Sequence, residues 1–257
     1  MTRSLIRGAF SVTFGVLLGL TGCAADMATL QKRLEPHYSA QRPEGPGPFP
    51  AILLVPGCGG VAPARVKTAE ELMRQGYVVV FVDYLSARGL QAACRGEVSV
   101  DEVAQDIRAV SAHVQSLPYV RPGAVGVVGW SLGGGGVLAS LVGTARDPQP
   151  PFRAAAAFYP VCRGLQPWKT HVPVLVLLAG LDDIAPPAPC QELGRSVGST
   201  YPVEVRTYPE ALHSFDMSDL PAKMPSRAFP GKTAGYHPEA AREAWADVLA
   251  QFDRQLR

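Results

Sequence analysis

Short apolar runs alternate with amphipathic stretches along most of the chain. The runs Ala51–Val55 and Tyr77–Asp83 are apolar or β-branched at nearly every position, which is typical of strands buried on both faces of a sheet. Between them, the stretch "KTAEELMRQG" (residues 67–76) has helical spacing and ends on Gly76, a residue that favours a helix C-terminus. Asp101–Leu117 places its apolar residues on one stripe, which predicts an amphipathic helix.

The same alternation continues to the C-terminus. Strands that alternate with helices favour an α/β fold, in which helices cover both faces of a doubly wound, mostly parallel sheet. The sequence has no internal repeat and no obvious linker, so residues 49–257 are predicted to form a single domain. The further strands are predicted at residues 124–129, 153–162, 172–180 and 203–209, and the further helices at residues 132–143, 188–198 and 237–257.

The first residues have the pattern of a targeting signal. A start that contains Arg3 and Arg7 is followed by an uncharged apolar run, too short for a membrane-spanning helix, and then by small residues. The stretch "LTGC" (Leu20–Cys23) resembles a bacterial lipobox, in which the cysteine is lipidated and becomes the new N-terminus. We expect residues 1–22 to be a lipoprotein-type signal peptide and Cys23 to carry the lipid. The alternative is an ordinary signal peptide that contains a cysteine.

The residues after Cys23 are polar and then rich in turn formers. We expect residues 23–48 to form a lead or tether, together with the first edge segment of the sheet. In bacterial lipoproteins, Ala24 rather than aspartate after the cysteine favours the outer membrane over the inner membrane. The predicted location is therefore the periplasmic side of the cell envelope, with the membrane contacted through the lipid anchor.

Composition and charge narrow the class of protein. The chain is 47% hydrophobic and 18% charged, which is typical of a globular domain with a sizeable core. It has 24 basic and 22 acidic residues, so without Arg3 and Arg7 the balance is 22 to 22. Such a chain lacks the clustered positive charge of a nucleic-acid-binding protein. Export would leave four cysteines besides Cys23 in an oxidising compartment, which favours two disulfides over free buried thiols.

The stretch "GWSLG" (Gly129–Gly133) follows a predicted strand and precedes a predicted helix. A serine that attacks a carbonyl must project from the backbone, and the G-x-S-x-G pattern places it on a sharp strand-to-helix turn. Gly129 and Gly133 would give clearance to the neighbouring strand and helix. The Leu132 N–H, at the start of the helix, would be one donor of an oxyanion hole. The bare motif is weak, and a glycine-rich packing turn is the alternative. Candidate partners downstream therefore decide its value.

A catalytic serine needs an acid and a general base, and in this class of fold they follow it along the chain in the order Ser, acid, His. Of the three histidines downstream of Ser131, His171 precedes a strand and His237 opens the last helix. Only His213 follows a strand, at the carboxyl edge where ligands bind in open α/β sheets, so it is the candidate base. The acid would be Asp182 or Asp183, which end another strand, and their spacing does not choose between them.

The second oxyanion donor should come from the loop after the first strong strand, "VPGCGG" (Val55–Gly60). Its glycines let the backbone approach a substrate oxygen, and the N–H of Cys58 or Gly57 is the expected donor. A plain turn is the alternative. No cluster of His, Cys and Asp has metal-ligand spacing, so we expect neither a metal nor an organic cofactor.

Several stretches together resemble the dienelactone hydrolase family of the α/β-hydrolase superfamily. They run from about Arg42 to the C-terminus, and the most specific is "YPEALHSFD" (Tyr208–Asp216), which contains His213. The others are "PEGPGPFPAILLVPGCGG", "DYLSARG", "GWSLGGG", "FYPVC" and "LDDIAPPAPC".

The resemblance implies a fold and roles for particular residues. It implies the α/β-hydrolase fold and assigns the acid to Asp182, the first aspartate of "LDD". It makes Arg88, in "SARG", similar to an arginine that binds a substrate carboxylate, and Trp130, beside Ser131, is a further candidate for substrate binding. The strand order of the superfamily implies the disulfides Cys58–Cys94 and Cys162–Cys190.

This chain departs from the dienelactone hydrolase pattern at two places. Dienelactone hydrolases proper use cysteine as the nucleophile where this chain has Ser131, and relatives usually have His-Gly where it has Pro56-Gly57. We therefore expect a serine hydrolase of small-molecule esters or lactones in general. A peptidase or acyltransferase of the same fold is one alternative, and a non-catalytic envelope-binding protein is another. The sequence carries no signal for the oligomeric state.

Overall fold

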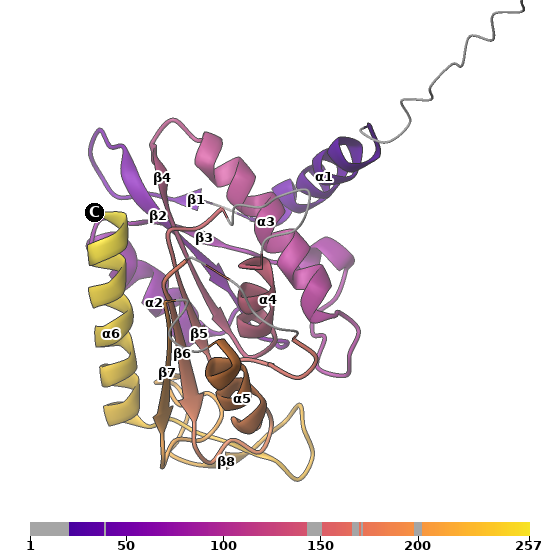
Figure 1. Cartoon of the computed structure of the whole chain (residues 1–257), viewed down its shortest axis with the longest axis vertical. Coiled ribbons are helices and arrows are strands. Elements are labelled where there is room, and N and C mark those ends of the chain that lie inside the picture. The colour runs from indigo at the N-terminus through magenta and orange to yellow at the C-terminus, as the bar shows by residue number, and fades with distance from the viewer. Residues whose placement is uncertain (1–20, 39, 143–150, 166–169, 171, 198–201) are drawn as a thin grey trace, which may run out of the picture.

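The core of the protein is a seven-stranded sheet. The computed structural model describes residues 21–257, except 39, 143–150, 166–169, 171 and 198–201. The strands lie in the order β1-β3-β2-β4-β5-β6-β7, and only the short edge strand β1 is antiparallel to its neighbour (Figure 1). The strand bounds are β1 Ala40–Gln41, β2 Phe49–Val55, β3 Val78–Phe81, β4 Val120–Trp130, β5 Ala154–Phe158, β6 Val174–Ala179 and β7 Val203–Tyr208.

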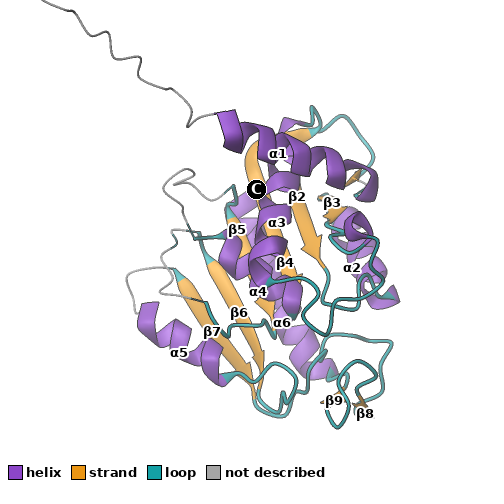
Figure 2. Cartoon of the chain, turned by 90° about the vertical axis from the view of Figure 1, so that its right-hand side faces the viewer, coloured by secondary structure: helices purple, strands orange, loops and turns teal. Residues whose placement is uncertain are grey.

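Helices cover both faces of this sheet (Figure 2). Along β2, Leu53 and Val55 belong to the core on one face, and Ile52 and Leu54 belong to the core on the other. This alternation explains why the strand is apolar at every position. On the first face lie α1 Thr21–Leu34, α3 Val100–Ser116, α4 Leu132–Ser140 and α5 Ala188–Val197, and on the second lie α2 Pro63–Arg74 and α6 Pro238–Leu256.

Local sequence explains several helix ends. Ser99 caps α3 in a capping box with Glu102, and each side chain receives a hydrogen bond from the backbone of the other residue. Helix α2 begins at Pro63, four residues before its predicted start at 67, because proline is accommodated in the first turn of a helix. His237 caps α6 through its ring nitrogen, which accepts a hydrogen bond from the Ala240 N–H.

The predicted lead, residues 23–48, is more ordered than we expected. Residues 21–34 form α1, which packs on α3, and the Gln31 side chain donates a hydrogen bond to the Ala109 carbonyl. Leu34 is buried in the core, and Leu30, one turn earlier, packs against it. These two leucines, one helical turn apart, give the helix an apolar contact with the core. The edge strand β1 follows at Ala40–Gln41.

The targeting prediction falls largely outside the described residues. Residues 1–20 are not described, and Cys23 is described only as part of the backbone of α1. Signal cleavage and lipidation of Cys23 therefore stay predictions. None of the helices in the described part of the chain is both long and apolar enough to cross a bilayer.

Candidate active site

Ser131 lies on the sharp turn that joins β4 to α4. Its φ of 52° and ψ of −117° are strained for a residue with a side chain, and the surroundings hold it there. The Ser131 N–H donates to the Phe158 carbonyl at 3.0 Å, and the Ser131 carbonyl accepts from Gly135 and Val161. This fixed turn presents the hydroxyl beyond the carboxyl edge of the sheet.

The glycines on either side of the turn are required by close packing. A Cβ at Gly129 would lie 2.5 Å from the Gly133 carbonyl oxygen, and a Cβ at Gly133 would lie 2.3 Å from the Val55 carbonyl oxygen. Both distances are shorter than real Cβ contacts. The motif therefore has the steric basis that the sequence suggested. Further along α4, Gly136 gives the same clearance to Val103 of α3.

His213 is paired with Asp182. The His213 Nδ1 lies 2.7 Å from the Asp182 Oδ2, and both side chains are buried. A carboxylate only accepts hydrogen bonds, so this contact places a proton on Nδ1 and leaves Nε2 of the neutral ring as an acceptor. The other Asp182 oxygen accepts from the backbone N–H groups of Ile184 and Ala185, at 2.9 and 2.8 Å, which fixes the carboxylate.

The structure separates the two aspartates that spacing left open. The Asp183 carboxylate accepts a hydrogen bond from the Thr233 N–H at 3.0 Å, and no hydrogen bond joins it to His213 in the described part of the chain. Asp183 therefore braces the loop before α6, whereas Asp182 contacts the imidazole. His237, the cap of α6, has a structural role, and His171 lies outside the described residues.

Ser131 and His213 line the same cavity, whose volume is about 460 Å³. This size falls within the range of small-molecule sites. No hydrogen bond joins the Ser131 hydroxyl to His213 in the described part of the chain. Such contacts commonly tighten only when substrate binds. The wall opposite the sheet comes from the segment after His213, which includes the short strands β8 Met224–Pro225 and β9 Thr233–Ala234.

The two residues expected to supply oxyanion donors lie at a smaller adjoining cavity of about 170 Å³. Cys58 and Leu132 line it together with Ser131. Among the described residues, neither the Cys58 N–H nor the Leu132 N–H has an acceptor within the protein. Leu132 is the first residue of α4, where a free N–H and the positive end of the helix dipole both favour an anion.

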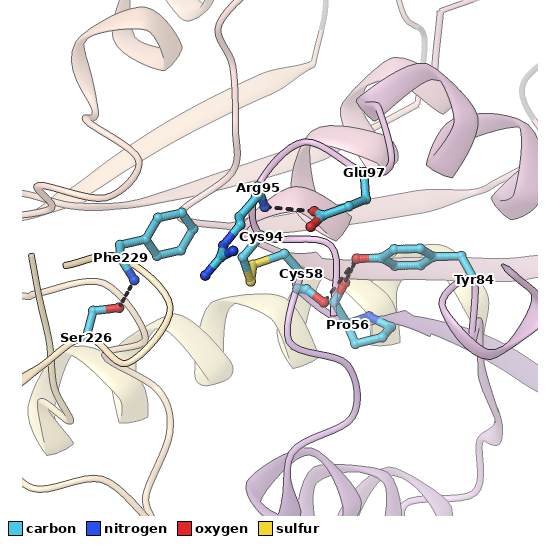
Figure 3. The surroundings of a disulfide bond; sticks show 9 residues. Pro56, Cys58, Tyr84, Cys94, Arg95, Glu97, Ser226 and Phe229 are labelled. Atoms are coloured by element: carbon cyan, nitrogen blue, oxygen red, sulfur yellow. Dashed lines mark hydrogen bonds between the residues drawn. A yellow bond between two sulfur atoms is a disulfide. The ribbon is translucent and has the colours of Figure 1, made fainter. Parts of the chain in front are cut away.

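Both disulfides that the family resemblance implied are formed. Cys58–Cys94 has a Cα–Cα distance of 4.9 Å, and Cys162–Cys190 has one of 5.2 Å. Figure 3 shows the first of them beside Pro56, with the Phe229 ring directed toward it and Arg95 between them. The loop that carries Cys58 is also held from behind, because the Tyr84 hydroxyl donates to the carbonyls of Pro56 and Gly57 at 3.2 and 3.0 Å.

The geometry does not support Arg88 as a residue that binds substrate. Its guanidinium donates to the Asp106 carboxylate on α3 and to the Tyr84 carbonyl, and Arg88 does not line the 460 Å³ cavity. The buried Asp106 draws it toward α3 instead. Trp130 does line the cavity, but its indole N–H is already used, since it donates to Asp216 at 2.9 Å.

A buried ion pair behind the cavity was not predicted from the sequence. Arg65 of α2 donates to both oxygens of Asp216, at 2.6 and 2.9 Å. The Tyr159 hydroxyl donates to Asp216 at 2.7 Å and accepts from Arg65 at 2.6 Å. The Arg65 guanidinium also lies 4.1 Å from the centre of the Trp130 ring. Nothing in the pattern around Arg65 marks it. Asp216, Tyr159 and Trp130 each lie in a family-like stretch, but nothing in those stretches indicates that the three residues meet Arg65.

Burial and pairing act in opposite directions on this cluster. Burial alone would raise the pKa of Asp216, but the Arg65 charge and the hydrogen bonds that Asp216 accepts hold it below its usual value. Burial raises the pKa of Tyr159 well above that of a free tyrosine, so its hydroxyl stays protonated. The Tyr159 ring also packs on the His213 ring, with 4.6 Å between their centres. Tyr159 thus links the ion pair to the candidate base.

The fold and this site define an α/β hydrolase: a parallel sheet, a serine on a tight turn after a central strand, and a His–Asp pair on later loops. The chain belongs to the dienelactone hydrolase family, whose family model matches residues 38–256. It is therefore a hydrolase that acts on esters or lactones.

Individual relatives agree with this assignment. The chain is 26% identical over 244 residues to a Synechocystis protein named "Putative carboxymethylenebutenolidase", covering 84% of this chain and 90% of that one. Two solved structures share the fold. The "Putative Dienelactone Hydrolase" of Klebsiella pneumoniae is 20% identical, has a TM-score of 0.68, and covers 84% of this chain and 92% of its own. A dienelactone hydrolase-like promiscuous phosphotriesterase from metagenomic libraries is 18% identical, has a TM-score of 0.62, and covers 85% and 98%.

Proposed function

We propose that the protein cleaves carboxylic esters or lactones through a Ser131–His213–Asp182 triad and an acyl-enzyme intermediate. The observation that carries this proposal is the 2.7 Å contact between His213 and Asp182 at the cavity that Ser131 also lines. A structural histidine would not need a buried carboxylate on Nδ1 and a ligand-sized cavity next to a strained serine. The three residues also follow one another in the order expected for this fold.

Each residue has a definite part in the reaction. The Ser131 oxygen attacks the substrate carbonyl carbon while His213 Nε2 takes the hydroxyl proton. Asp182 stabilises the imidazolium and keeps the ring in the required tautomer. The carbonyl oxygen becomes an oxyanion, which the N–H groups of Leu132 and Cys58 receive. The tetrahedral intermediate then breaks its bond to the alcohol oxygen, and His213 gives its proton to the departing alcohol.

Water then releases the acyl group by the reverse sequence of proton transfers. His213 removes a proton from a water molecule, whose oxygen attacks the acyl-enzyme carbonyl. The second tetrahedral intermediate breaks the bond to Ser131, and the proton returns to the serine oxygen. The products are a carboxylic acid and free enzyme. For a lactone, acid and alcohol are parts of one molecule.

Covalent labelling of the chain that starts after residue 22 tests this proposal. A fluorophosphonate probe should label the wild type, and Ser131→Ala should abolish labelling. Ser218→Ala, at an exposed serine, should leave it unchanged. His213→Ala should slow labelling by at least about a hundredfold, whereas His237→Ala should not. A folded wild type that is not labelled would refute the triad and favour a binding protein.

We also propose that Cys23 is lipidated and that the enzyme is held on the periplasmic side of the outer membrane. The support comes from the "LTGC" stretch and from Ala24 after the cysteine. Metabolic labelling with an alkyne fatty acid should modify the wild type but not Cys23→Ser. The modified protein should fractionate with outer membranes. A soluble, unlabelled wild type would show an ordinary cleaved signal.

A further inference from the structure

We propose that the substrate is an uncharged ester or lactone whose apolar part fills the cavity, and not one that carries a carboxylate. This inference rests on the proposed function and adds the class of substrate. It is drawn from three features of the described residues. These are the ion pair of Arg65 with Asp216, the ion pair of Arg88 with Asp106, and the side chains that line the cavity. Each bears on whether an anion could be held beside Ser131.

Arg65 is the buried cation in the cavity wall, but its charge is already neutralised. Its side chain is 4% exposed and that of Asp216 is 0% exposed, and the two form a bidentate pair. Asp216 is in turn saturated by Tyr159 and Trp130. To bind a substrate carboxylate, Arg65 would have to leave Asp216 as a buried, uncompensated charge, which is strongly unfavourable. The cavity wall at Arg65 therefore offers no free cation, and the Trp130 and Tyr159 side chains beside it are each only 2% exposed.

Arg88, the other arginine suited to a carboxylate, points away from the cavity. It is paired with Asp106, whose side chain is 0% exposed, and it also donates to the Tyr84 carbonyl. Burial raises the pKa of Asp106, against the opposing effect of Arg88. Moving Arg88 to the cavity would leave Asp106 with only Arg33, whose guanidinium lies 3.5 Å from it and is half exposed. Such a movement would break the ion pair of a buried carboxylate, which is unfavourable, and no new contact in the cavity would offset the loss.

The rest of the cavity is mainly apolar. Four large apolar side chains come from the segment after His213, and each is partly buried. Burying a carboxylate against such side chains without a partner removes its hydration and gives nothing in return. An alkyl or aryl group of the same shape would gain free energy from the same contacts. These four residues are Met217, Leu220, Met224 and Phe229.

Arg227 also lines the cavity, but it is exposed to solvent. Screening by water and salt leaves an exposed charge with little influence on binding. Arg95 is exposed as well and does not line the cavity. The proposal therefore predicts that neither arginine selects the substrate. It also predicts that Arg227→Ala leaves the preference for uncharged esters unchanged.

Matched pairs of esters test the proposal on both sides of the scissile bond. On the acyl side, p-nitrophenyl 4-methylpentanoate has nearly the same shape as the p-nitrophenyl monoester of succinate. On the alcohol side, 4-isopropylphenyl acetate corresponds to 4-carboxyphenyl acetate. The ratio of kcat/KM should favour the uncharged ester by about a hundredfold or more on at least one side, and the carboxylate should be preferred on neither.

A variant locates the preference in the cavity. Met217→Ala should lower kcat/KM for the larger uncharged ester by about tenfold, with little change for p-nitrophenyl acetate, because it removes contacts that only the larger group makes. A carboxylate ester that is hydrolysed as well as its uncharged partner, or better, would overturn the proposal. If this activity fell in Arg227→Ala, Arg227 would be the anion site. Absence of both labelling and turnover for every ester would refute the proposed function itself.

Discussion

Arg65 and Asp216 join α2 to the segment that follows His213, through two hydrogen bonds of 2.6 and 2.9 Å. Arg65 follows the loop that carries Cys58, and Asp216 lies three residues after His213. Trp130, which donates to Asp216, precedes Ser131 directly. The pair thus connects the chain segments from which the candidate nucleophile, base and oxyanion donor come.

Breaking this pair should destabilise the protein strongly. Arg65→Met leaves Asp216 buried without its counter-charge, and the expected loss in free energy of unfolding is about 3–5 kcal/mol. Arg195→Met, which removes an exposed pair with Glu192, should cost about 1 kcal/mol or less. Urea unfolding of both variants measures the difference. Similar losses in the free energy of unfolding for the two variants would show that the buried pair stabilises the protein no more than an exposed one.

The same pair predicts a pH dependence of stability. The pKa of Asp216 is lower in the folded chain than its ordinary value of 3.8. Its contribution to stability is therefore fully present above that ordinary value and is lost as the pH falls through the folded pKa. In Asp216→Asn, the deficit against wild type should shrink as the pH is lowered from about 7 to about 3. Unfolding midpoints across this range measure it. A deficit that grows on acidification would contradict the assigned direction.

Exchange of the two neighbouring aspartates separates orientation of the base from support of the loop. Asp182→Asn should lower kcat by about three to four orders of magnitude, because an amide cannot stabilise the imidazolium or hold its tautomer. Asp183→Asn keeps an oxygen that can accept from the Thr233 N–H, so kcat should change by less than about tenfold. Steady-state kinetics of both variants on one ester measure the two losses in kcat. A larger loss in Asp183→Asn than in Asp182→Asn would assign the acid to Asp183.

Loss of the Cys58–Cys94 disulfide should act on the reaction more than loss of Cys162–Cys190 does. Both bridges should contribute about 2–4 kcal/mol to stability. Only the first holds the loop with a candidate oxyanion donor, beside Ser131. Cys94→Ser is therefore expected to lower kcat, with a smaller change in KM, at a temperature where it is folded. Cys190→Ser is the control. Equal effects on kcat would mean that the loop is held by other contacts, such as those of Tyr84.

Glycine substitutions test the packing of the nucleophile turn. Gly133→Ala would place a Cβ 2.3 Å from backbone oxygens of Val55 and Pro56, which cannot move away easily. It should destabilise the protein by about 1–3 kcal/mol and displace Ser131. Gly59→Ala, in the loop after β2, has no atom within 4 Å of the new Cβ and should be close to neutral. Thermal melts and fluorophosphonate labelling together measure both effects.

The sequence by itself determined the sheet and the positions of the chemistry. Strands buried on both faces have to be apolar at consecutive positions, so β2 and β3 were recognisable without any tertiary information. Ser131 was marked by its glycines, because only glycine fits where a strand, a turn and a helix meet so closely. His213 was selected because it follows a strand, and the carboxyl ends of parallel strands share one edge.

Other features depended on contacts between residues far apart in the chain. Spacing could not choose between Asp182 and Asp183, since that choice depends on which carboxylate meets an imidazole 31 residues away. Local pattern could not show that residues 21–34 form a helix against α3, because which partner a helix packs on is set only by the tertiary fold. Nor could it show that Arg88 turns to Asp106 or that Arg65 meets Asp216 across 151 residues. A charged side chain has no periodic signature, and its partner is set only when the folded core brings the two together.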